Sequence, residues 1–287
     1  MGRAPRGVRP VPAAPSFASY VIRLFLCDID GCLSEAFEPF DLDGLARVRA
    51  LAARGGPHGT GPYPAFSILT GRAYAYTEAY AQLLDTQVPV YFEAGAGAFD
   101  RALARVTWHP AFTPEIEAAL VEVRQWFFSD LLPGTTLAFD YGKRTQVGVI
   151  SADRAAISAA AVRTRAFVAS LDAPLQVFQT AISVDVVPLG LAKGDALAWI
   201  SAMTGIALDE MGYIGDSEGD IEALRRVGAA FAPSNAVPGV REVVDVVTAS
   251  PGLYGVLEAY EEIVARNAAE LETGTIQADA AFRMRRS

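Results

Sequence analysis

The sequence predicts an α/β fold in which a parallel sheet is interrupted by a smaller α+β insert. Three observations support this prediction. Short apolar runs alternate with amphipathic segments up to Asp100, the same alternation returns after Pro188, and the stretch between them shows hairpin signals instead. Strands that alternate with helices form parallel sheets with right-handed crossovers, whereas strand pairs around tight turns form antiparallel ones.

The first third of the chain predicts strand, helix, strand, helix, strand. Val21–Cys27 is a short apolar run that ends abruptly at an acidic segment, which is typical of a buried parallel strand. Asp41–Arg54 is expected to be a helix, because its Leu and Val residues recur on one face, Asp41 can cap its start and Gly55 can end it. After a loop at Gly55–Pro64, the predicted elements are a strand at Ala65–Leu69, a helix at Ala73–Leu84 and a strand at Val88–Phe92.

The stretch after Asp100 predicts an α+β unit. Thr113 and Pro114 indicate a helix start, since Thr caps helices and proline is favoured in the first turn. Two alternating segments flank Gly142 and Lys143, which indicates a β-hairpin. The predicted elements are strands at Thr135–Tyr141, Arg144–Ile150, Leu175–Gln179 and Ile182–Val187, and a second helix at Ala152–Ser170.

After Pro188 the chain returns to the first pattern. The two ends of the chain are expected to differ from the rest: Met1–Tyr20 is interpreted as a flexible tail, and Thr273–Ser287 as loosely held. The predicted elements are helices at Leu191–Met203 and Glu218–Arg226, strands at Met211–Ile214, Ala229–Phe231 and Val246–Thr248, and a C-terminal helix from Leu253 to beyond Glu270.

Composition argues against several classes of protein. The chain has 33 acidic and 24 basic residues and a formal net charge of -9, which disfavours binding to nucleic acid or to anionic membranes. No apolar run reaches the roughly 18–20 residues of a membrane span. The two cysteines, Cys27 and Cys32, are too few for a disulfide framework and are interpreted as packing residues in a reduced, cytoplasmic protein.

Polar side chains follow several of the predicted strands. In an open parallel sheet, sites form at the carboxyl ends of the strands, so these side chains are expected to lie together. They are Asp28 and Asp30 after the first strand, Thr70 after the second, Asp216, Ser217 and Asp220 after the strand at Met211–Ile214, and Lys193 at the start of the preceding helix.

Several carboxylates in one place repel one another unless a cation joins them. Magnesium is the natural choice, because it prefers hard oxygen ligands and keeps room for a substrate phosphate. The expected ligands are Asp28, Asp30, Asp216 and Asp220.

These residue types predict phosphoryl transfer. Asp28 can attack phosphorus and form an aspartyl-phosphate. Asp30, two residues on, can protonate the leaving oxygen and then activate a water molecule. Lys193 and Thr70 can neutralise and hydrogen-bond the phosphoryl oxygens.

Four segments resemble the signatures of the haloacid dehalogenase superfamily, in the same order and at similar spacing. They are Asp28-Ile29-Asp30-Gly31-Cys32, Thr70-Gly71-Arg72, Lys193 within Leu191–Leu197, and Gly215-Asp216-Ser217-Glu218-Gly219-Asp220. The resemblance covers about residues 21–270 and implies a Rossmann-like core, Mg²⁺ as cofactor and hydrolysis of a phosphomonoester. Gly219 stands where relatives often have Asn, and Cys32 stands where Thr is usual.

The insert resembles the α/β cap of the Cof-like branch, which includes sucrose-phosphate, mannosyl-phosphoglycerate and archaeal phosphoglycolate phosphatases. Val90–Ala98 and Phe231–Thr248 resemble other recurrent segments of that branch. The resemblance implies a small phosphorylated metabolite as substrate: a sugar phosphate, a glycosyl phosphoglycerate or phosphoglycolate. It also implies substrate contacts from Gly71, Arg72, Lys143, Arg144 and Asn235.

Each of these residues also has an ordinary structural reading. Asp28 and Asp30 suit turns, Thr70 can cap a helix, and Asp220 suits a helix N-terminus. Lys193 can be a solvated helix residue. Lys143 and Arg144 can belong to a solvated hairpin turn, and Asn235 can shape a loop.

The sequence therefore predicts a flexible tail at residues 1–19, a catalytic core at 20–100 and 188–287, and a cap at 101–187. We expect a phosphatase that acts as a monomer or homodimer. Two alternatives stay open: a phosphomutase, which would rephosphorylate the bound product, and a non-catalytic module that binds a phosphorylated metabolite.

Overall fold

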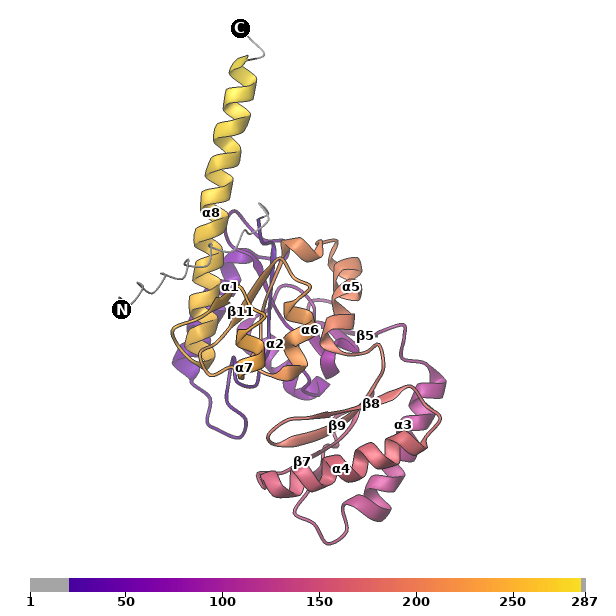
Figure 1. Cartoon of the computed structure of the whole chain (residues 1–287). Helices are drawn as coiled ribbons and strands as arrows, with labels where there is room; N and C mark the ends of the chain where they lie inside the picture. Colours follow the sequence, from indigo (N-terminus) through magenta and orange to yellow (C-terminus); the bar gives the residue numbers. More distant parts are fainter. Residues whose placement is uncertain (1–20, 285–287) are drawn as a thin grey trace, which may run out of the picture.

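A five-stranded parallel sheet forms the centre of the larger part of the molecule (Figure 1). The computed structural model describes the backbone of residues 21–284 and the side chains of residues 21–273. All four strand pairings are parallel, and every residue of the interior strand β1 is fully buried, as its apolar sequence predicts. The α/β prediction is confirmed. In sheet order, the strands are β12 (Val246–Val247), β11 (Ala229–Ala232), β10 (Met211–Ile214), β1 (Leu24–Cys27) and β2 (Ala65–Ile68).

The strand order creates a switch point beside β1. The chain leaves β1 towards β2 on one side, and β10 pairs with β1 on the other. Loops that follow the two neighbouring strands β1 and β10 therefore diverge, and a crevice at this edge is the usual location of a ligand site in such sheets.

Helices cover both faces of this sheet, because successive side chains of a strand point to opposite sides. Phe25 and Cys27 of β1 pack in one apolar cluster with residues of α1, α2 and α8, whereas Leu24 and Leu26 pack in another with residues of α5, α6 and α7. The helices are α1 (Leu42–Gly55), α2 (Tyr74–Leu84), α5 (Lys193–Thr204), α6 (Ile221–Leu224), α7 (Pro238–Arg241) and α8 (Gly252–Met284), with 3₁₀ turns η1 (Glu93–Gly95), η3 (Leu208–Glu210) and η4 (Glu218–Asp220).

A second, antiparallel sheet continues from the edge of the first. It consists of β3 (Val90–Phe92), β4 (Gly97–Asp100) and β5 (Arg105–Trp108). The predicted strand at Val88–Phe92 starts at Val90 and touches the parallel sheet through a single bridge between Leu69 and Tyr91. The sequence analysis missed β4 and β5, because glycine and charged residues interrupt the apolar pattern of these segments.

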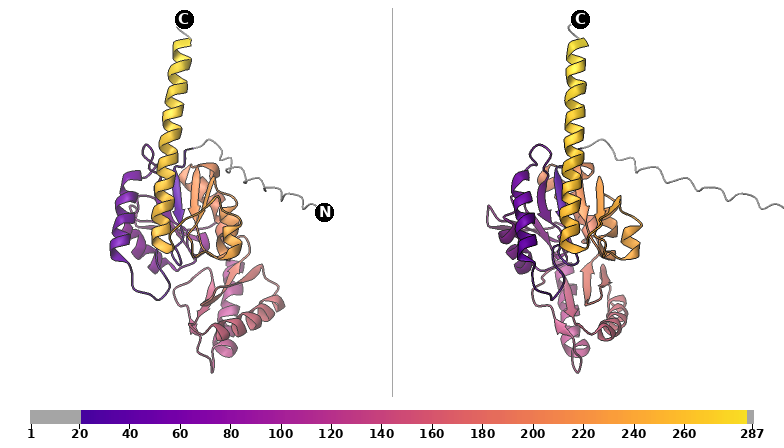
Figure 2. Two further views of the ribbon diagram at one scale, coloured as in Figure 1. Left: turned by 60° about the vertical axis from the view of Figure 1, so that its left-hand side comes forward. Right: turned by 90° about the vertical axis from the view of Figure 1, so that its left-hand side faces the viewer.

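The cap is a four-stranded antiparallel sheet with two helices packed on it. Leu120 and Val123 of α3 meet Val147 and Val184 of the sheet in one buried cluster. The order is β6 (Ala138–Phe139), β7 (Val147–Ile150), β9 (Ser183–Pro188) and β8 (Leu175–Gln179), and the helices are α3 (Pro114–Trp126), extended by a π-helical turn η2 (Phe127–Leu131), and α4 (Arg154–Ser170). The two views of Figure 2 show the cap adjoining one end of the core.

The first cap hairpin is shorter than predicted. Strands were expected to reach Tyr141 and to resume at Arg144, but pairing stops at Phe139 and resumes at Val147. The backbone N–H groups of Arg144 and Thr145 donate to a carboxylate of the core instead of to a neighbouring strand. The turn between β6 and β7 therefore belongs to the interface with the core.

At the C-terminus, the backbone is helical in the segment that was expected to be loosely held. Helix α8 continues through Met284, although the chain was expected to be loosely held from Thr273 onwards. The last turns of this helix extend away from the core (Figure 1). The predicted flexible tail lies outside the described residues.

Cys27 and Cys32 are buried free thiols, and within residues 21–284 no helix combines the length and apolarity that crossing a membrane requires.

Candidate active site

The ammonium group of Lys193 joins two carboxylates at the switch point of the sheet. Its Nζ atom lies 2.6 Å from Oδ2 of Asp28, which follows β1, and 2.6 Å from Oδ1 of Asp220, which lies in the turn after β10. Lys193 is the first residue of α5, so the helix holds its side chain at the carboxyl edge of the sheet. Burial alone would lower the pKa of Lys193, but the two carboxylates outweigh it and raise that pKa, so the lysine is a cation.

Asp220 is held by several donors besides Lys193. The Tyr213 hydroxyl donates to its Oδ1, and the backbone N–H and hydroxyl of Ser217 donate to its Oδ2 at 3.0 and 2.9 Å. Burial would raise the pKa of Asp220, but Lys193 and these donors lower it overall. Asp220 is therefore a fixed negative charge that anchors Lys193.

Asp28 is less strongly held. Its Oδ1 accepts the N–H of Ile29 at 2.8 Å and its Oδ2 faces Lys193. Burial, with the nearby charges of Asp220 and Asp30, raises the pKa of Asp28 to about 6 although Lys193 lowers it. The Asp28 carboxylate is thus ionised at neutral pH and carries a charge that a nucleophile can use.

Three carboxylates form a group that fits a divalent cation. One oxygen each from Asp28, Asp216 and Asp220 lies within 4.8 Å of the others. Burial, together with the negative charges of Asp28 and Asp220, raises the pKa of Asp216 to about 8. A bound cation would offset this repulsion between the carboxylates. Hard carboxylate oxygens with space for water and phosphate are what Mg²⁺ prefers. The carboxylate of Asp30 is not in this group.

Gly31 leaves the space that Asp216 occupies. A Cβ atom on Gly31 would lie 2.1 Å from Oδ2 of Asp216, and the φ of Gly31 is +70°. Both the close approach and the left-handed backbone favour glycine here. The turn after β1 therefore brings the segment Asp28–Cys32 directly against the segment Gly215–Asp220.

Asp30 pairs with Arg72 and is not one of the three grouped carboxylates. Nε and Nη2 of Arg72 lie 2.6 and 2.5 Å from the two oxygens of Asp30. The hydroxyl of Thr70 accepts the backbone N–H of Arg72 at 3.2 Å, so the loop after β2 positions this guanidinium. A Cβ atom on Gly71 would meet nothing within 4 Å, which leaves the space beside that backbone open.

Glu93 joins the same loop to the cap, and the sequence analysis did not select it. Its carboxylate accepts the N–H groups of Arg144 (3.0 Å) and Thr145 (2.5 Å) and the Thr145 hydroxyl (2.6 Å). Its own N–H donates to the carbonyl of Arg72 at 2.9 Å, and the N–H of Ala94 donates to the carbonyl of Thr70 at 2.8 Å. Glu93 and Ala94 have φ of +50° and +59°, a costly conformation that these contacts hold in place.

A sequence signal for Glu93 existed. It directly follows β3, so the rule that polar residues at strand ends gather in one place applies to it as well. Tyr213 gave no such signal, because a tyrosine inside an apolar strand reads as part of the core.

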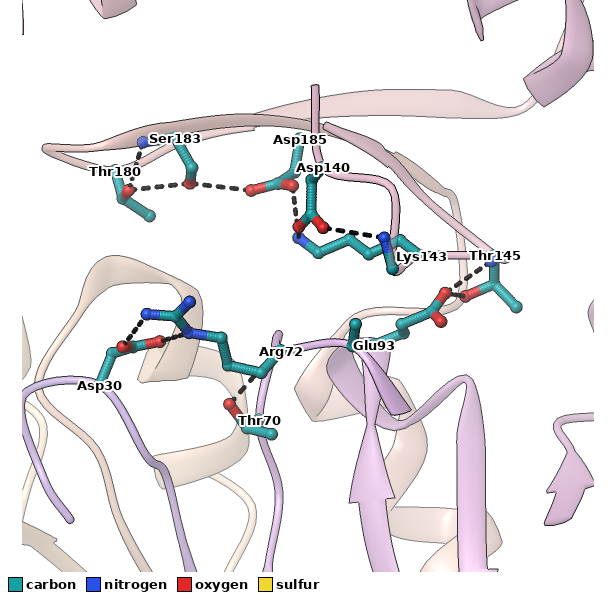
Figure 3. Close-up of polar contacts among 12 residues, drawn as sticks. Asp30, Thr70, Arg72, Glu93, Asp140, Lys143, Thr145, Thr180, Ser183 and Asp185 are labelled. Atoms are coloured by element: carbon teal, nitrogen blue, oxygen red, sulfur yellow. Dashed lines mark hydrogen bonds and ion pairs between the residues drawn. The ribbon is translucent and has the colours of Figure 1, made fainter. Parts of the chain in front are cut away.

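The predicted cap residues Lys143 and Arg144 are both paired within the protein. Nζ of Lys143 lies 2.5 Å from Asp185 and 3.5 Å from Asp140, and only 8% of its side chain is exposed. Figure 3 shows Lys143 with its two aspartates across from the Asp30–Arg72 pair. Arg144 instead pairs with Glu117 at 3.2 Å and lies over the ring of Trp108.

Asn235 connects two backbone segments behind the site. Its Nδ2 donates to the carbonyl of Gly31 at 2.9 Å, and its Oδ1 accepts the N–H of Gly252 at 2.8 Å. These contacts hold the turn after β1 against the start of α8. Gly219, where relatives often have Asn, lies beside Ser217, which supplies two hydrogen bonds to Asp220.

The arrangement combines the parts that phosphoryl transfer requires. An ionised carboxylate lies beside an ammonium group and a cluster of oxygen ligands, and a second acid and a guanidinium lie at the next strand end.

Comparison with known proteins agrees with this geometry. The profile of the haloacid dehalogenase-like hydrolases matches residues 163–259. A phosphoglycolate phosphatase from Halorubrum lacusprofundi is 29% identical over 231 residues, which cover 79% of this chain and 91% of the relative. One from Archaeoglobus fulgidus is 41% identical over 71 residues, 25% of this chain and 32% of the relative, so this match spans about a third of that protein's length.

A solved structure shows that the architecture is shared. The crystal structure of a Thermoplasma acidophilum protein superposes with a TM-score of 0.65 at 18% identity, covering 85% of this chain and 99% of the other. At this identity the match concerns the fold. Together with the four signatures and the profile match over residues 163–259, it supports a likeness of the chain to the haloacid dehalogenase-like hydrolases.

Proposed function

We propose that this protein is a Mg²⁺-dependent phosphatase that hydrolyses a small phosphomonoester through an aspartyl-phosphate on Asp28. The position of Lys193 between Asp28 and Asp220, next to Asp216, is the observation that supports it most directly. This arrangement gives a buried nucleophile, a fixed positive charge and a set of hard oxygen ligands in one place. The phosphoglycolate phosphatases among the relatives support the same reaction class.

In the first step, an oxygen of Asp28 forms a bond to phosphorus while the bond from phosphorus to the leaving oxygen breaks. The proton of Asp30 passes to the leaving oxygen, which departs as an alcohol. In the second step, Asp30 takes a proton from water, the water oxygen bonds to phosphorus, and the bond to Asp28 breaks. Inorganic phosphate leaves and both carboxyl groups return to their starting states.

Asp28, Asp216 and Asp220 would hold the Mg²⁺ ion. When bound, this ion would neutralise charge on the phosphoryl oxygens and relieve the repulsion among the carboxylates. Lys193 adds a second positive charge on the same side, and the Thr70 hydroxyl can donate to a phosphoryl oxygen.

Arg72 links phosphate binding to the acid. In the absence of substrate, its guanidinium is bound bidentately by Asp30. A phosphoryl group presents the same geometry to a guanidinium as a carboxylate does, so an arriving phosphate can replace Asp30 on Arg72. Asp30 is then released from this ion pair and can act on the leaving oxygen.

Phosphate release from a panel of phosphorylated compounds tests this proposal. The panel contains p-nitrophenyl phosphate, sugar phosphates, 3-phosphoglycerate and 2-phosphoglycolate, each measured with Mg²⁺ and with excess chelator. We expect Mg²⁺-dependent release that Asp28→Asn reduces by about 10³-fold or more, whereas Asp172→Asn, which changes an exposed cap residue, retains it. Release that survives Asp28→Asn would contradict the proposal, and isomerised product without free phosphate would indicate a phosphomutase.

A further inference from the structure

The cap presents a cluster of polar side chains to the core. Lys143 lies between Asp185 and Asp140, with Nζ–O distances of 2.5 and 3.5 Å. Ser183 donates to Oδ2 of Asp185 at 2.9 Å, and the hydroxyls of Thr180 and Ser183 lie 2.9 Å apart. We call these five residues the cap polar cluster. Four of its members come from the β6–β7 turn and from β9, whose backbone the cap sheet fixes.

The cap polar cluster lies opposite the catalytic residues. Figure 3 shows it across from the Asp30–Arg72 pair, with the Glu93–Thr145 contact beside both. The turn that carries Lys143 packs closely on the core, since a Cβ atom on Gly142 would lie 2.8 Å from Cβ of Ala73. Ala73 directly follows Arg72, so the cluster faces the position that the leaving group of a bound phosphomonoester would occupy.

The charge of the cluster is unfavourable for an anionic leaving group. One ammonium is shared by two carboxylates, which gives a formal charge of about -1. Lysine occurs at two positions in this chain, 143 and 193, and each forms ion pairs with two aspartates. Arg144 cannot compensate, because its guanidinium pairs with Glu117 and lies over the rings of Trp108 and Phe112.

A carboxylate on the substrate would have to separate Lys143 from Asp185. The side chains of these two residues are only 8% and 13% exposed, so the displaced aspartate would remain a poorly solvated, unpaired charge. A hydroxyl group avoids this conflict. It can donate to Asp140 or Asp185 and accept from Lys143 while the ion pairs stay intact.

We propose that the cap selects substrates whose leaving group is a neutral polyhydroxyl compound, such as a sugar or polyol phosphate, over those that carry a carboxylate. This inference rests on the proposed phosphatase function and assigns the selection to Asp185 and Asp140. It distinguishes this protein from the phosphoglycolate phosphatases that it resembles in sequence, whose substrate carries a carboxylate next to the phosphate ester.

Two matched pairs of substrates test the inference. Glycerol 3-phosphate and 3-phosphoglycerate differ by a CH₂OH group in place of a carboxylate, and so do 2-hydroxyethyl phosphate and 2-phosphoglycolate. We expect kcat/KM to favour the hydroxyl member of each pair by at least about tenfold, as like charges in a partly buried site are strongly disfavoured. Equal values, or a preference for the carboxylate member, would overturn the inference.

Variants connect the preference to the cluster. Asp185→Asn should reduce the ratio of the two kcat/KM values by at least about fivefold, because it removes one of the two negative charges. Asp140→Asn is a second variant of the same kind, on a surface turn instead of a central strand. Asp172→Asn, an exposed aspartate elsewhere in the cap, should leave the ratio unchanged. An unchanged ratio in both cluster variants would overturn the assignment.

The same assay separates this inference from the proposed function. Hydrolysis of p-nitrophenyl phosphate without hydrolysis of either hydroxyl substrate would overturn the inference alone. Hydrolysis of none of the five compounds in the presence of Mg²⁺ would overturn both.

Discussion

Lys193 forms an ion pair with Asp28, with 2.6 Å between Nζ and Oδ2, and both side chains are over 90% buried. A charge that is removed from water is stabilised only by its partners, so each of these residues depends on the other. The same lysine pairs with Asp220, which makes it the single cation between two buried carboxylates. The ion pairs of Lys193 therefore stabilise the folded switch point and keep the nucleophile Asp28 ionised.

Lys193→Met should lower both the free energy of unfolding and the rate of phosphate release. Without the ammonium, Asp28 and Asp220 are left as buried charges, and breaking a buried pair costs about 3–5 kcal/mol of the free energy of unfolding. Phosphate release should fall by about 10²–10³-fold, the usual effect of losing one group that stabilises transition-state charge. Urea unfolding and steady-state kinetics measure the two effects. Arg154→Met, which removes an exposed cap cation, is the control, and a Lys193 variant as active as this control would contradict the assignment.

Gly31→Ala should weaken metal binding. The new methyl group would meet Asp216 at 2.1 Å from Oδ2, so this carboxylate must move away from Asp28 and Asp220. We expect the Mg²⁺ concentration for half-maximal activity to rise by about 10–100-fold, as when ligand geometry is disturbed. Gly134→Ala is a matched control, because Gly134 has a φ of +71° but no atom within 4 Å of its Cβ position. Equal Mg²⁺ requirements in the two variants would count against Asp216 as a ligand.

Glu93→Gln should loosen the cap from the core. The amide keeps the shape of the side chain but places N–H donors against the N–H groups of Arg144 and Thr145, a mismatch of about 1–3 kcal/mol. We expect faster hydrogen exchange at these two amides and a kcat/KM lowered by about tenfold, mainly through KM. Glu122→Gln changes an exposed residue of α3 and controls for charge. Unaltered exchange at Arg144 and Thr145 would show that Glu93 does not anchor the cap.

His109 should make stability depend on pH. Burial lowers the pKa of His109 below its ordinary 6.5, although Asp195 acts in the opposite direction, and its Nδ1 accepts the N–H of Ala111 at 3.1 Å. As the pH falls below 6.5, His109 therefore binds a proton more readily in the unfolded chain than in the folded one. The free energy of unfolding that His109 contributes is present above pH 6.5 and is lost as the pH falls. His109→Gln keeps an acceptor and should flatten this part of the profile in urea unfolding with saturating Mg²⁺. The exposed His58→Gln should not, and identical profiles for both variants would refute the prediction.

Much of the fold could be predicted because its signals are local. The start of α1 is an example: Asp41 accepts the N–H of Gly44 at 2.9 Å, as expected of a residue that caps a helix. The approach of Asp28 to Asp220 follows from a general rule about strand ends and needs no long-range information. By contrast, the end of β6 depends on Glu93, a residue far along the chain that takes the hydrogen bonds of the cap turn.

The states of the cap residues were not predictable in the same way. The sequence places Lys143 and Arg144 in one turn, but it does not show that Asp185, 42 residues away, neutralises the lysine or that Glu117 and two aromatic rings take the arginine. Such pairings arise when separate strands and helices pack, so tertiary contacts decide them. For the same reason, a basic residue in a cap turn does not by itself indicate an anion site.

Chemical trapping of the intermediate tests the central claim most directly. The protein is mixed with Mg²⁺ and its best substrate, quenched during turnover with borohydride, which reduces an acyl phosphate to an alcohol, and digested for mass spectrometry. The account predicts homoserine at position 28, formed only when substrate is present and absent from the same peptide of Asp28→Asn. Phosphate release without modification at Asp28, or modification at another carboxylate, would contradict it.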